Sequence, residues 1–120
     1  MLPIKKILNE CLADVPDAVG AIFLDHEGES VEFETRGCSP HDAKVIGAYA
    51  GIFLSQVERI ARELALGSTS RLKVDFQHVS VLTALLQDGY YLVLVLREDA
   101  LEARAWRSME RTRERLLAEM

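Results

Sequence analysis

The residues that could bind a metal ion are few and widely separated in this sequence. The three histidines, His26, His41 and His78, lack the spacing of metal ligands, and the two cysteines, Cys11 and Cys38, lie far apart. Zinc sites are built from such side chains at short, regular intervals or clustered by the fold. The sequence therefore predicts no metal site and no cofactor.

Acid–base chemistry has one weak candidate, the pair Asp25 and Glu27. Both fall in an expected turn, where a carboxylate more often hydrogen-bonds the local backbone than acts in catalysis. The sequence contains no phosphate-binding glycine loop, no dinucleotide-binding fingerprint and no nucleophile elbow. We therefore expect no catalytic residue, and an enzyme is the least favoured class of function.

Length and composition indicate a single domain spanning residues 1–120. About half of the residues, 49%, are hydrophobic, which is enough for a core without disulfides. The net charge of −5 argues against nucleic-acid binding, which relies on a basic surface. No apolar run reaches the roughly 20 residues that span a bilayer, and residues 1–6 lack the order of a signal peptide. We therefore expect a cytoplasmic protein with reduced cysteines and no membrane insertion.

Hydrophobic periodicity predicts three helices and five strands in the order α-β-β-α-β-β-β-α. Helices are expected over residues 2–14 and 40–66 and from residue 100 to the end, and strands over 19–25, 30–35, 71–76, 79–87 and 90–96.

Several boundaries have a specific local signal. Ser39 can cap the long helix, with Pro40 at its first position, and Gly67 is the expected stop. Residues 88–89 are an Asp-Gly hairpin turn, and Asp99 is expected to cap the last helix.

The polarity of the strands predicts their arrangement. Strands 19–25, 79–87 and 90–96 are apolar on both faces, so we place them centrally, whereas 30–35 and 71–76 alternate and should be edges. With hairpins joining neighbours, this gives an α+β fold with an antiparallel sheet in the order 2-1-5-4-3. The long helix should cover one face, and the terminal helices the other.

The long helix carries more apolar surface than one sheet face requires. The stripe expected to face the core is Ala43, Ile46, Ala50, Phe53, Val57, Ile60 and Leu64. Further apolar residues lie on its other faces, and Gly47 and Gly51 are four residues apart. Because glycine costs about 1 kcal/mol in a helix interior, two of them suggest the close approach of another helix.

We interpret this surface as a homodimer interface in which the helix packs against its symmetry mate and edge strand 71–76 pairs with its copy. The opposite edge carries Glu32 and Glu34, which would repel a copy of itself. The alternative is a monomer in which the glycines accommodate a bulky strand residue. The predicted interface residues are Val45, Gly47, Ala48, Tyr49, Gly51, Ile52, Leu72, Val74 and Phe76.

Two polar or mixed helix faces are candidates for a further partner. Beside the apolar seam, the predicted partner-binding rim consists of Gln56, Arg59, Arg62 and Glu63. A solvated helix face is the alternative interpretation of this rim. On the last helix, the apolar residues at helical spacing indicate packing on the sheet, with a partner groove as the alternative; they are Trp106, Met109, Leu116 and Leu117.

This order of elements, with its long helix rich in small residues, resembles the roadblock/dynein light chain superfamily over nearly the whole chain. The resemblance lies in residues 15–21 (VPDAVGA) and 24–29 (LDHEGE), in the helix with Gly47, Ala50 and Gly51, and in the closing hairpin at 89–95 (GYYLVLV). Within the superfamily the chain looks most like bacterial MglB-type proteins. Family members usually have Pro-Gly before the first strand, where this chain has Pro16-Asp17-Ala18.

The resemblance implies a roadblock (profilin-like) fold and a homodimer with one continuous sheet. It also implies a small Ras-like GTPase as a direct or indirect partner in a bacterial polarity or motility system. Activators of the MglB type reposition the GTPase's own residues, so Arg59 and Arg62 are not assigned a catalytic role. Two alternatives remain: an adaptor for another roadblock or polarity protein, and a small-molecule sensor, although the tight loops leave little room for a pocket.

Overall fold

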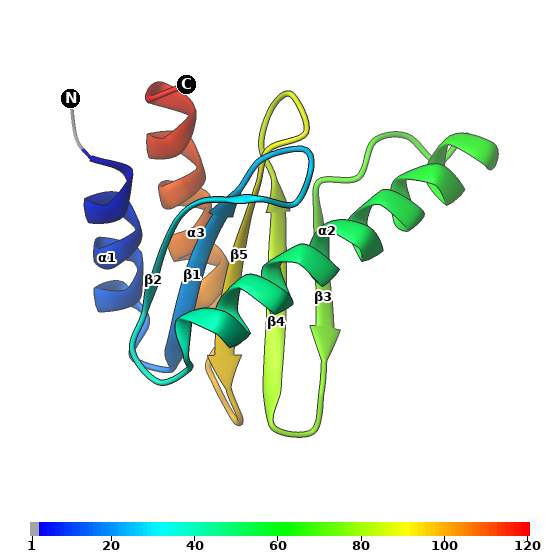
Figure 1. Ribbon diagram of the computed structural model, residues 1–120. Helices are drawn as coiled ribbons and strands as arrows, with labels where there is room; N and C mark the ends of the chain where they lie inside the picture. The colour runs from blue at the N-terminus through cyan, green and yellow to red at the C-terminus, as the bar shows by residue number, and fades with distance from the viewer. Residues whose placement is uncertain (1–2) are drawn as a thin grey trace.

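The computed structural model describes residues 3–120 and has three layers (Figure 1). Helix α2 (Pro40–Glu63) lies on one face of a five-stranded antiparallel sheet, and helices α1 (Ile4–Asp14) and α3 (Glu102–Ala118) lie on the other. The strands run in the order β2-β1-β5-β4-β3. Their bounds are β1 Ala18–Leu24, β2 Ser30–Thr35, β3 Arg71–Asp75, β4 Val79–Leu85 and β5 Tyr91–Arg97. The predicted order of elements and the predicted sheet are confirmed. The expected start of the first helix at Leu2 lies outside the described residues.

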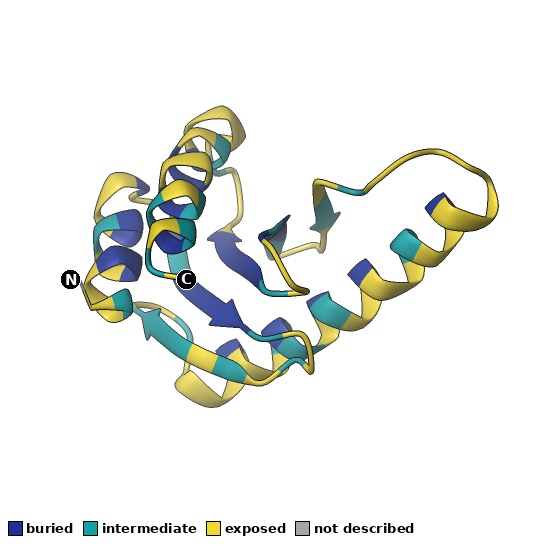
Figure 2. Cartoon of the chain, turned by 90° about the horizontal axis from the view of Figure 1, so that it is seen from above, coloured by how far each residue is buried: buried dark blue, intermediate teal, exposed yellow. Residues whose placement is uncertain are grey.

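Burial explains why the strands take these positions. Nearly every residue of β1 and β5 is buried, because helices cover both faces of the sheet there. Figure 2 shows the contrast with the edge strands β2 and β3, which are only half-buried or exposed along their whole length. The contrast between uniformly apolar and alternating strands therefore identified the central and edge positions correctly.

The start of α2 and the β4–β5 hairpin follow their local sequence signals. Ser39 caps α2, since its hydroxyl accepts a hydrogen bond of 3.0 Å from the backbone N–H of Asp42. Asp88 and Gly89 both have positive φ, at 56° and 80°, and Tyr90 donates its N–H to the carbonyl of Gln87 at 3.0 Å. This geometry is the type I′ turn that an Asp-Gly pair favours.

Two other helix boundaries differ from the prediction. Helix α2 ends at Glu63 rather than at residue 66, because Ala65 already adopts a left-handed conformation with φ of 55°. Leu66 then donates its N–H to the carbonyl of Ala61 at 2.8 Å, which is the bond that closes a Schellman motif. The predicted stop, Gly67, lies beyond this motif.

The predicted cap of the last helix is wrong. Asp99 has φ of 63° and belongs to the turn after β5, whereas a capping residue needs an extended backbone. Leu101 occupies the capping position, with φ of −77° and ψ of 99°, and it makes no side-chain capping bond. Helix α3 therefore begins at Glu102.

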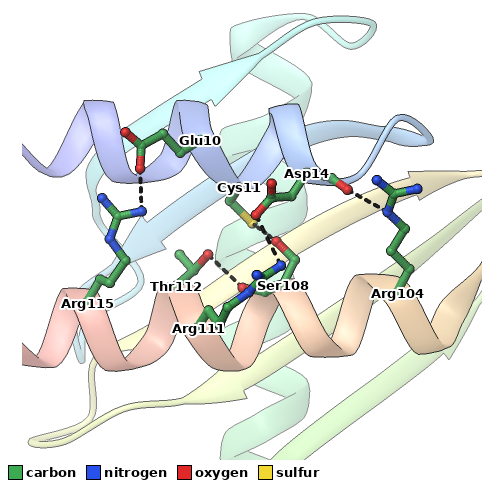
Figure 3. A network of polar contacts seen from close by, with 8 residues as sticks. All are labelled: Glu10, Cys11, Asp14, Arg104, Ser108, Arg111, Thr112 and Arg115. Atoms are coloured by element: carbon green, nitrogen blue, oxygen red, sulfur yellow. Dashed lines mark hydrogen bonds and ion pairs between the residues drawn. The ribbon is translucent and has the colours of Figure 1, made fainter.

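Helices α1 and α3 pack on the sheet and against each other. Met109 and Leu116 are buried in the core beneath them, and Trp106 and Leu117 pack against that core, which confirms the packing interpretation of these four residues. Between the helices, Cys11 Sγ and Ser108 Oγ are 3.6 Å apart (Figure 3).

Around this contact lies a network of polar side chains. Arg104 Nε donates to the backbone carbonyl of Asp14 at 2.8 Å, Arg111 pairs with the Asp14 carboxylate at 3.3 Å, and Arg115 pairs with Glu10 (Figure 3). Burial raises the pKa of the Cys11 thiol above its usual range. Cys11 and Cys38 are not bridged.

Candidate interaction surface

The face of α2 that packs on the sheet differs from the predicted stripe. Phe53, Ile60 and Leu64 were expected in the core, but they are 38%, 50% and 65% exposed. The helix instead turns a row of mostly small residues toward the sheet, namely Ala43, Gly47, Ala50, Leu54 and Ala61. Small side chains let the helix axis approach the strands, so the large side chains lie at the sides of the helix and on its outer face.

The two helix glycines contact the sheet of their own chain. A Cβ on Gly51 would lie 2.2 Å from Tyr91 Oη, and a Cβ on Gly47 would lie 2.8 Å from a Leu24 methyl carbon. Tyr91 Oη also donates a 3.0 Å hydrogen bond to the Gly47 carbonyl. The prediction that these glycines admit a second helix is therefore wrong, and Gly47 is fully enclosed by its own sheet. The part of the alternative in which the glycines accommodate bulky strand residues is confirmed, and the homodimer stays a prediction.

The environment of Tyr91 fixes its protonation state. Burial raises the pKa of this phenol to about 12, and the nearby Asp25 acts in the same direction. Tyr91 is therefore a neutral hydrogen-bond donor at neutral pH, and its hydroxyl ties the middle of α2 to β5.

A largely apolar groove of about 300 Å³ lies between α2 and the strands β3 and β4. It contains five of the predicted interface residues, namely Val45, Tyr49, Leu72, Val74 and Phe76. Tyr49 and Phe76 are 56% and 53% exposed, which is unusual for large apolar side chains that face each other across a groove. The expectation that the tight loops leave little room for a pocket is wrong at this place.

The remaining predicted interface residues on α2 face elsewhere. Ala48, Gly51 and Ile52 line a second groove of about 460 Å³, beside the β1–β2 turn and the β4–β5 hairpin. This groove is mixed in polarity, since His26 and Glu58 also line it. The predicted interface is therefore divided between two sides of α2.

Helix α2 is longer than the sheet face beneath it. Its C-terminal end projects past the edge strand β3 (Figures 1 and 2). Ile60, Leu64 and Leu66 belong to this overhang and its cap, and each is at least half exposed. The overhang thus carries apolar side chains beyond the edge of its own sheet.

The edge at β3 is open for hydrogen bonding. Phe76 donates its N–H to the Val79 carbonyl at 2.8 Å, and the Ser70 carbonyl accepts from the N–H of Leu85 at 3.0 Å. The backbone N–H and C=O groups of the even-numbered residues along β3 therefore point toward β4. Backbone groups alternate in direction along an antiparallel strand. The N–H and C=O groups of residues 71, 73 and 75 therefore point away from the sheet.

The opposite edge, at β2, is occupied by a lysine. Lys5 of α1 donates from Nζ to the Phe33 carbonyl at 3.1 Å and lies 3.6 Å from each of Glu32 and Glu34. The two glutamates are thus paired with Lys5, and a lysine over an edge strand hinders further strand pairing.

The predicted partner-binding rim is exposed but does not form one cluster. Arg59 Nε lies 3.6 Å from Glu63 Oε1 one helical turn away. Gln56 lines the mixed groove beside Ile52, whereas Arg62 lines a separate surface hollow with Ala65 and residues 67–69. Its role in partner binding stays a prediction.

The residues with metal or acid–base potential remain apart. Within residues 3–120, no three His, Cys, Asp or Glu side chains come together as a metal site would require. Asp25 accepts hydrogen bonds from the backbone N–H groups of Glu27 and Glu29, at 2.9 and 3.1 Å, so it shapes the β1–β2 turn. In the same described part of the chain, no helix has the length and apolarity needed to cross a membrane.

No family model matches the sequence, and no curated protein matches it. Solved structures do match in fold. A Roadblock/LC7 domain from Streptomyces avermitilis gives a TM-score of 0.84 at 16% identity, over 93% of this chain and 92% of that one. The gliding protein MglB of Thermus thermophilus gives 0.85 at 16% identity, over 96% of this chain and 86% of that one. MglC of Myxococcus xanthus gives 0.69 at 22% identity, over 98% of both chains.

Proposed function

Since this chain has the roadblock fold, as its sequence predicted, we propose that it is a non-catalytic homodimeric module that regulates or scaffolds a small Ras-like GTPase. The observation that carries the dimer is the exposed apolar side of α2 beside the open edge of β3. A single chain leaves the apolar side of α2 exposed and the backbone groups of the β3 edge unpaired, and a two-fold axis beside the β3 edge would cover the first and pair the second.

The proposed axis runs perpendicular to the sheet. It makes the two β3 edges antiparallel neighbours, and their outward backbone groups extend the ladder into one sheet. Because α2 projects past β3, the overhang of each protomer then lies over the β3 strand of the other. Ile60 and Leu64 of one copy thereby approach the groove that contains Tyr49 and Phe53 of the other. Each large apolar side chain fully buried in this way contributes about 1.5–3 kcal/mol.

The proposed GTPase link is supported by the fold shared with the gliding protein MglB and by the family resemblance of the sequence. We place the GTPase contact at the rim formed by Gln56, Arg59, Arg62 and Glu63. A two-fold dimer presents this exposed polar surface twice on its α2 side. The rim would bind and orient the GTPase, whose own residues hydrolyse GTP.

The first experiment measures assembly. Sedimentation equilibrium at micromolar concentration is expected to give the mass of a dimer. A strict monomer at that concentration would overturn the homodimer.

The second experiment measures GTP hydrolysis. Single-turnover hydrolysis by a candidate small Ras-like GTPase is followed with and without the protein. Acceleration supports activation, and binding without acceleration supports scaffolding. Failure to bind the GTPase, together with capture of another roadblock protein, favours the adaptor function instead.

The rim is tested by titration calorimetry with Arg59→Glu. The variant should remain a dimer and bind the GTPase at least about tenfold more weakly, the loss expected for a charged contact at an interface. Arg107→Glu, on the exposed side of α3, makes the same charge change on the opposite face of the sheet and should bind as the wild type does. Equal affinity of both variants and wild type removes Arg59 from the contact.

A further inference from the structure

Strand β3 can pair with its own copy in only a few registers. In antiparallel pairing across a two-fold axis, one residue lies at the axis and faces its own copy. Residues at equal distances before and after it then face each other. The outward backbone groups belong to residues 71, 73 and 75. Each of these odd-numbered residues must therefore lie opposite an odd-numbered residue of the other copy. The axis can then pass through any residue from 71 to 75.

The charges on one face of β3 distinguish these registers. Arg71, Lys73 and Asp75 share the face that carries α3, and Lys73 pairs there with Glu102. An axis through residue 71 or 75 opposes that residue to its own copy, and an axis through residue 72 opposes Arg71 to Lys73. An axis through residue 73 opposes Lys73 to its own copy between two Arg71–Asp75 pairs. Like charges directly opposite each other destabilise a strand pair. Only an axis through Val74 forms opposite-charge pairs with no like-charge pair, because it opposes Lys73 to Asp75 twice and Arg71 to Gln77.

The apolar face of β3 favours the same register. With the axis at Val74, Phe76 of each copy lies opposite Leu72 of the other, and the two Val74 side chains meet. Phe76 is 53% exposed in the single chain, so an aromatic–aliphatic cross-strand pair would cover it. With the axis at Lys73, Phe76 would instead lie opposite Ser70.

We propose that β3 is a self-complementary edge whose Lys73 and Asp75 select a second copy of this chain and fix the dimer register with Val74 on the two-fold axis. This inference rests on the proposed homodimer and adds the residues that specify it. An edge strand without this alternation of charge would meet β3 with unpaired or like charges. The edge thus favours self-association over pairing with other roadblock edges.

The two charged groups are already held in place at the edge. Lys73 Nζ lies 3.3 Å from Asp75 Oδ2 and hydrogen-bonds to Glu102 of α3. The hydrogen bond to Glu102 raises the pKa of Lys73, and a 2.6 Å hydrogen bond from Ser80 lowers the pKa of Asp75. Both groups therefore stay charged across the neutral pH range.

Cysteine cross-linking reads the register directly. A residue on the axis opposes its own copy with Cα atoms about 4.5–5.5 Å apart, which is within the range of a disulfide. Leu72→Cys, Lys73→Cys and Val74→Cys are each oxidised in a Cys38→Ser background, in which the remaining Cys11 is buried. Val74→Cys should form the covalent dimer, and the other two variants should remain mostly uncross-linked. Preferential cross-linking at residue 72 or 73 overturns the register.

Charge exchange tests specificity. Lys73→Glu and Asp75→Lys each oppose like charges in their own homodimers, so each should dimerise about tenfold more weakly than wild type. When the two variants are mixed, the introduced glutamate opposes the introduced lysine, and the native Asp75 opposes the native Lys73. The mixture should form a heterodimer of near wild-type affinity in sedimentation. Arg71→Gln is the control, because residue 71 lies opposite Gln77 and should have no effect.

The outcomes separate the two proposals. A wild-type chain that sediments as a monomer removes the homodimer and the register together. Two results would keep the homodimer and overturn the register. In the first, the wild type dimerises but the two charge variants do not recover affinity on mixing. In the second, Arg71→Gln weakens the dimer and Lys73→Glu does not.

Discussion

The two faces of the sheet differ in how far a single chain completes them. On the face of α1 and α3, large side chains such as Leu94 and Met109 are fully buried, and polar contacts join the two helices (Figure 3). On the face of α2, Leu24 and Tyr91 are buried, but Tyr49 and Phe53 remain exposed over β3. We conclude that a single chain completes the first face, whereas the second face has a core of its own but stays incomplete beside β3.

The difference follows from simple dimensions. Five strands spaced about 4.8 Å apart make a sheet roughly 20 Å wide, whereas one helix with its side chains is about 10–12 Å wide. Two helices can therefore cover one face, but the single helix α2 cannot cover the other. Because α2 crosses the sheet obliquely, the uncovered part lies at β3.

The largest effect is expected on the completed face. Leu94→Ala removes a fully buried side chain beneath α1 and α3 and should lower the free energy of unfolding by about 2–5 kcal/mol. Urea unfolding at two protein concentrations measures it, and the loss should be the same at both. Leu94→Val, which loses one methylene, should cost about 1 kcal/mol and serves if the alanine variant does not fold. A loss that grows on dilution would contradict the conclusion that a single chain completes this face.

The next effect is expected on the incomplete face. Tyr49→Asp places a charge in the apolar groove and should raise the dissociation constant of the proposed dimer about 30-fold or more, the effect expected for loss of a central interface residue. The stability of the monomer should change by less than about 0.5 kcal/mol, since Tyr49 is exposed there. Val31→Asp, at an exposed valine on the β2 edge, is the matched control and should leave association unchanged. Equal dimerisation of both variants would remove the groove from the interface.

A third substitution tests where the completed part of the α2 face ends. Gly51→Ala should lower the free energy of unfolding by about 1–3 kcal/mol, because its Cβ would overlap the Tyr91 hydroxyl. This outcome opposes helix propensity, which favours alanine by about 1 kcal/mol. In thermal unfolding, the Gly51→Ala/Tyr91→Phe double variant should lose less than the sum of the single losses. A weaker dimer with an unchanged monomer would instead return Gly51 to the interface between chains.

The order of the strands could be predicted from the sequence because it depends on patterns that each strand carries. Uniform apolarity identified β1 and β5 as central, and alternation identified β2 and β3 as edges. Local signals sufficed where the structure is local, as at Ser39.

The orientation of α2 could not be predicted in the same way. Helical periodicity permits the stripe through Phe53 and Ile60 and also the stripe one residue later through Leu54 and Ala61. The choice depends on how closely the helix approaches Tyr91, which is a contact between distant parts of the chain. Tyr49 and Phe76 were predicted as interface residues because they are apolar beyond the needs of the core, but the groove that they line was not predicted. The projection of α2 past β3 required the crossing angle, which no sequence pattern records.

The smallest effect is expected at the end of the α2 overhang. Ala65 holds a left-handed backbone with φ of 55°, which costs a residue with a side chain about 1–2 kcal/mol. Ala65→Gly removes that strain but adds freedom to the unfolded chain, so a net gain of about 0.5–1 kcal/mol is expected. Ala48→Gly, the same substitution in the right-handed part of α2, should instead destabilise by about 1 kcal/mol.

Amide hydrogen exchange locates the gain from Ala65→Gly. Protection should rise at Leu64 and Leu66, in the overhang and its cap, because this segment projects past β3 and is stabilised mainly by its own Schellman motif. A second copy that contacts the Schellman motif should make the gain in amide protection larger in the dimer than in the monomer. A second copy that contacts only the earlier part of the overhang should leave the gain the same. Equal gains in protection in the dilute monomer and in the concentrated dimer would therefore show that the contact between protomers extends no further than Leu64, before the Schellman motif. A larger gain in the dimer would extend it to Leu66.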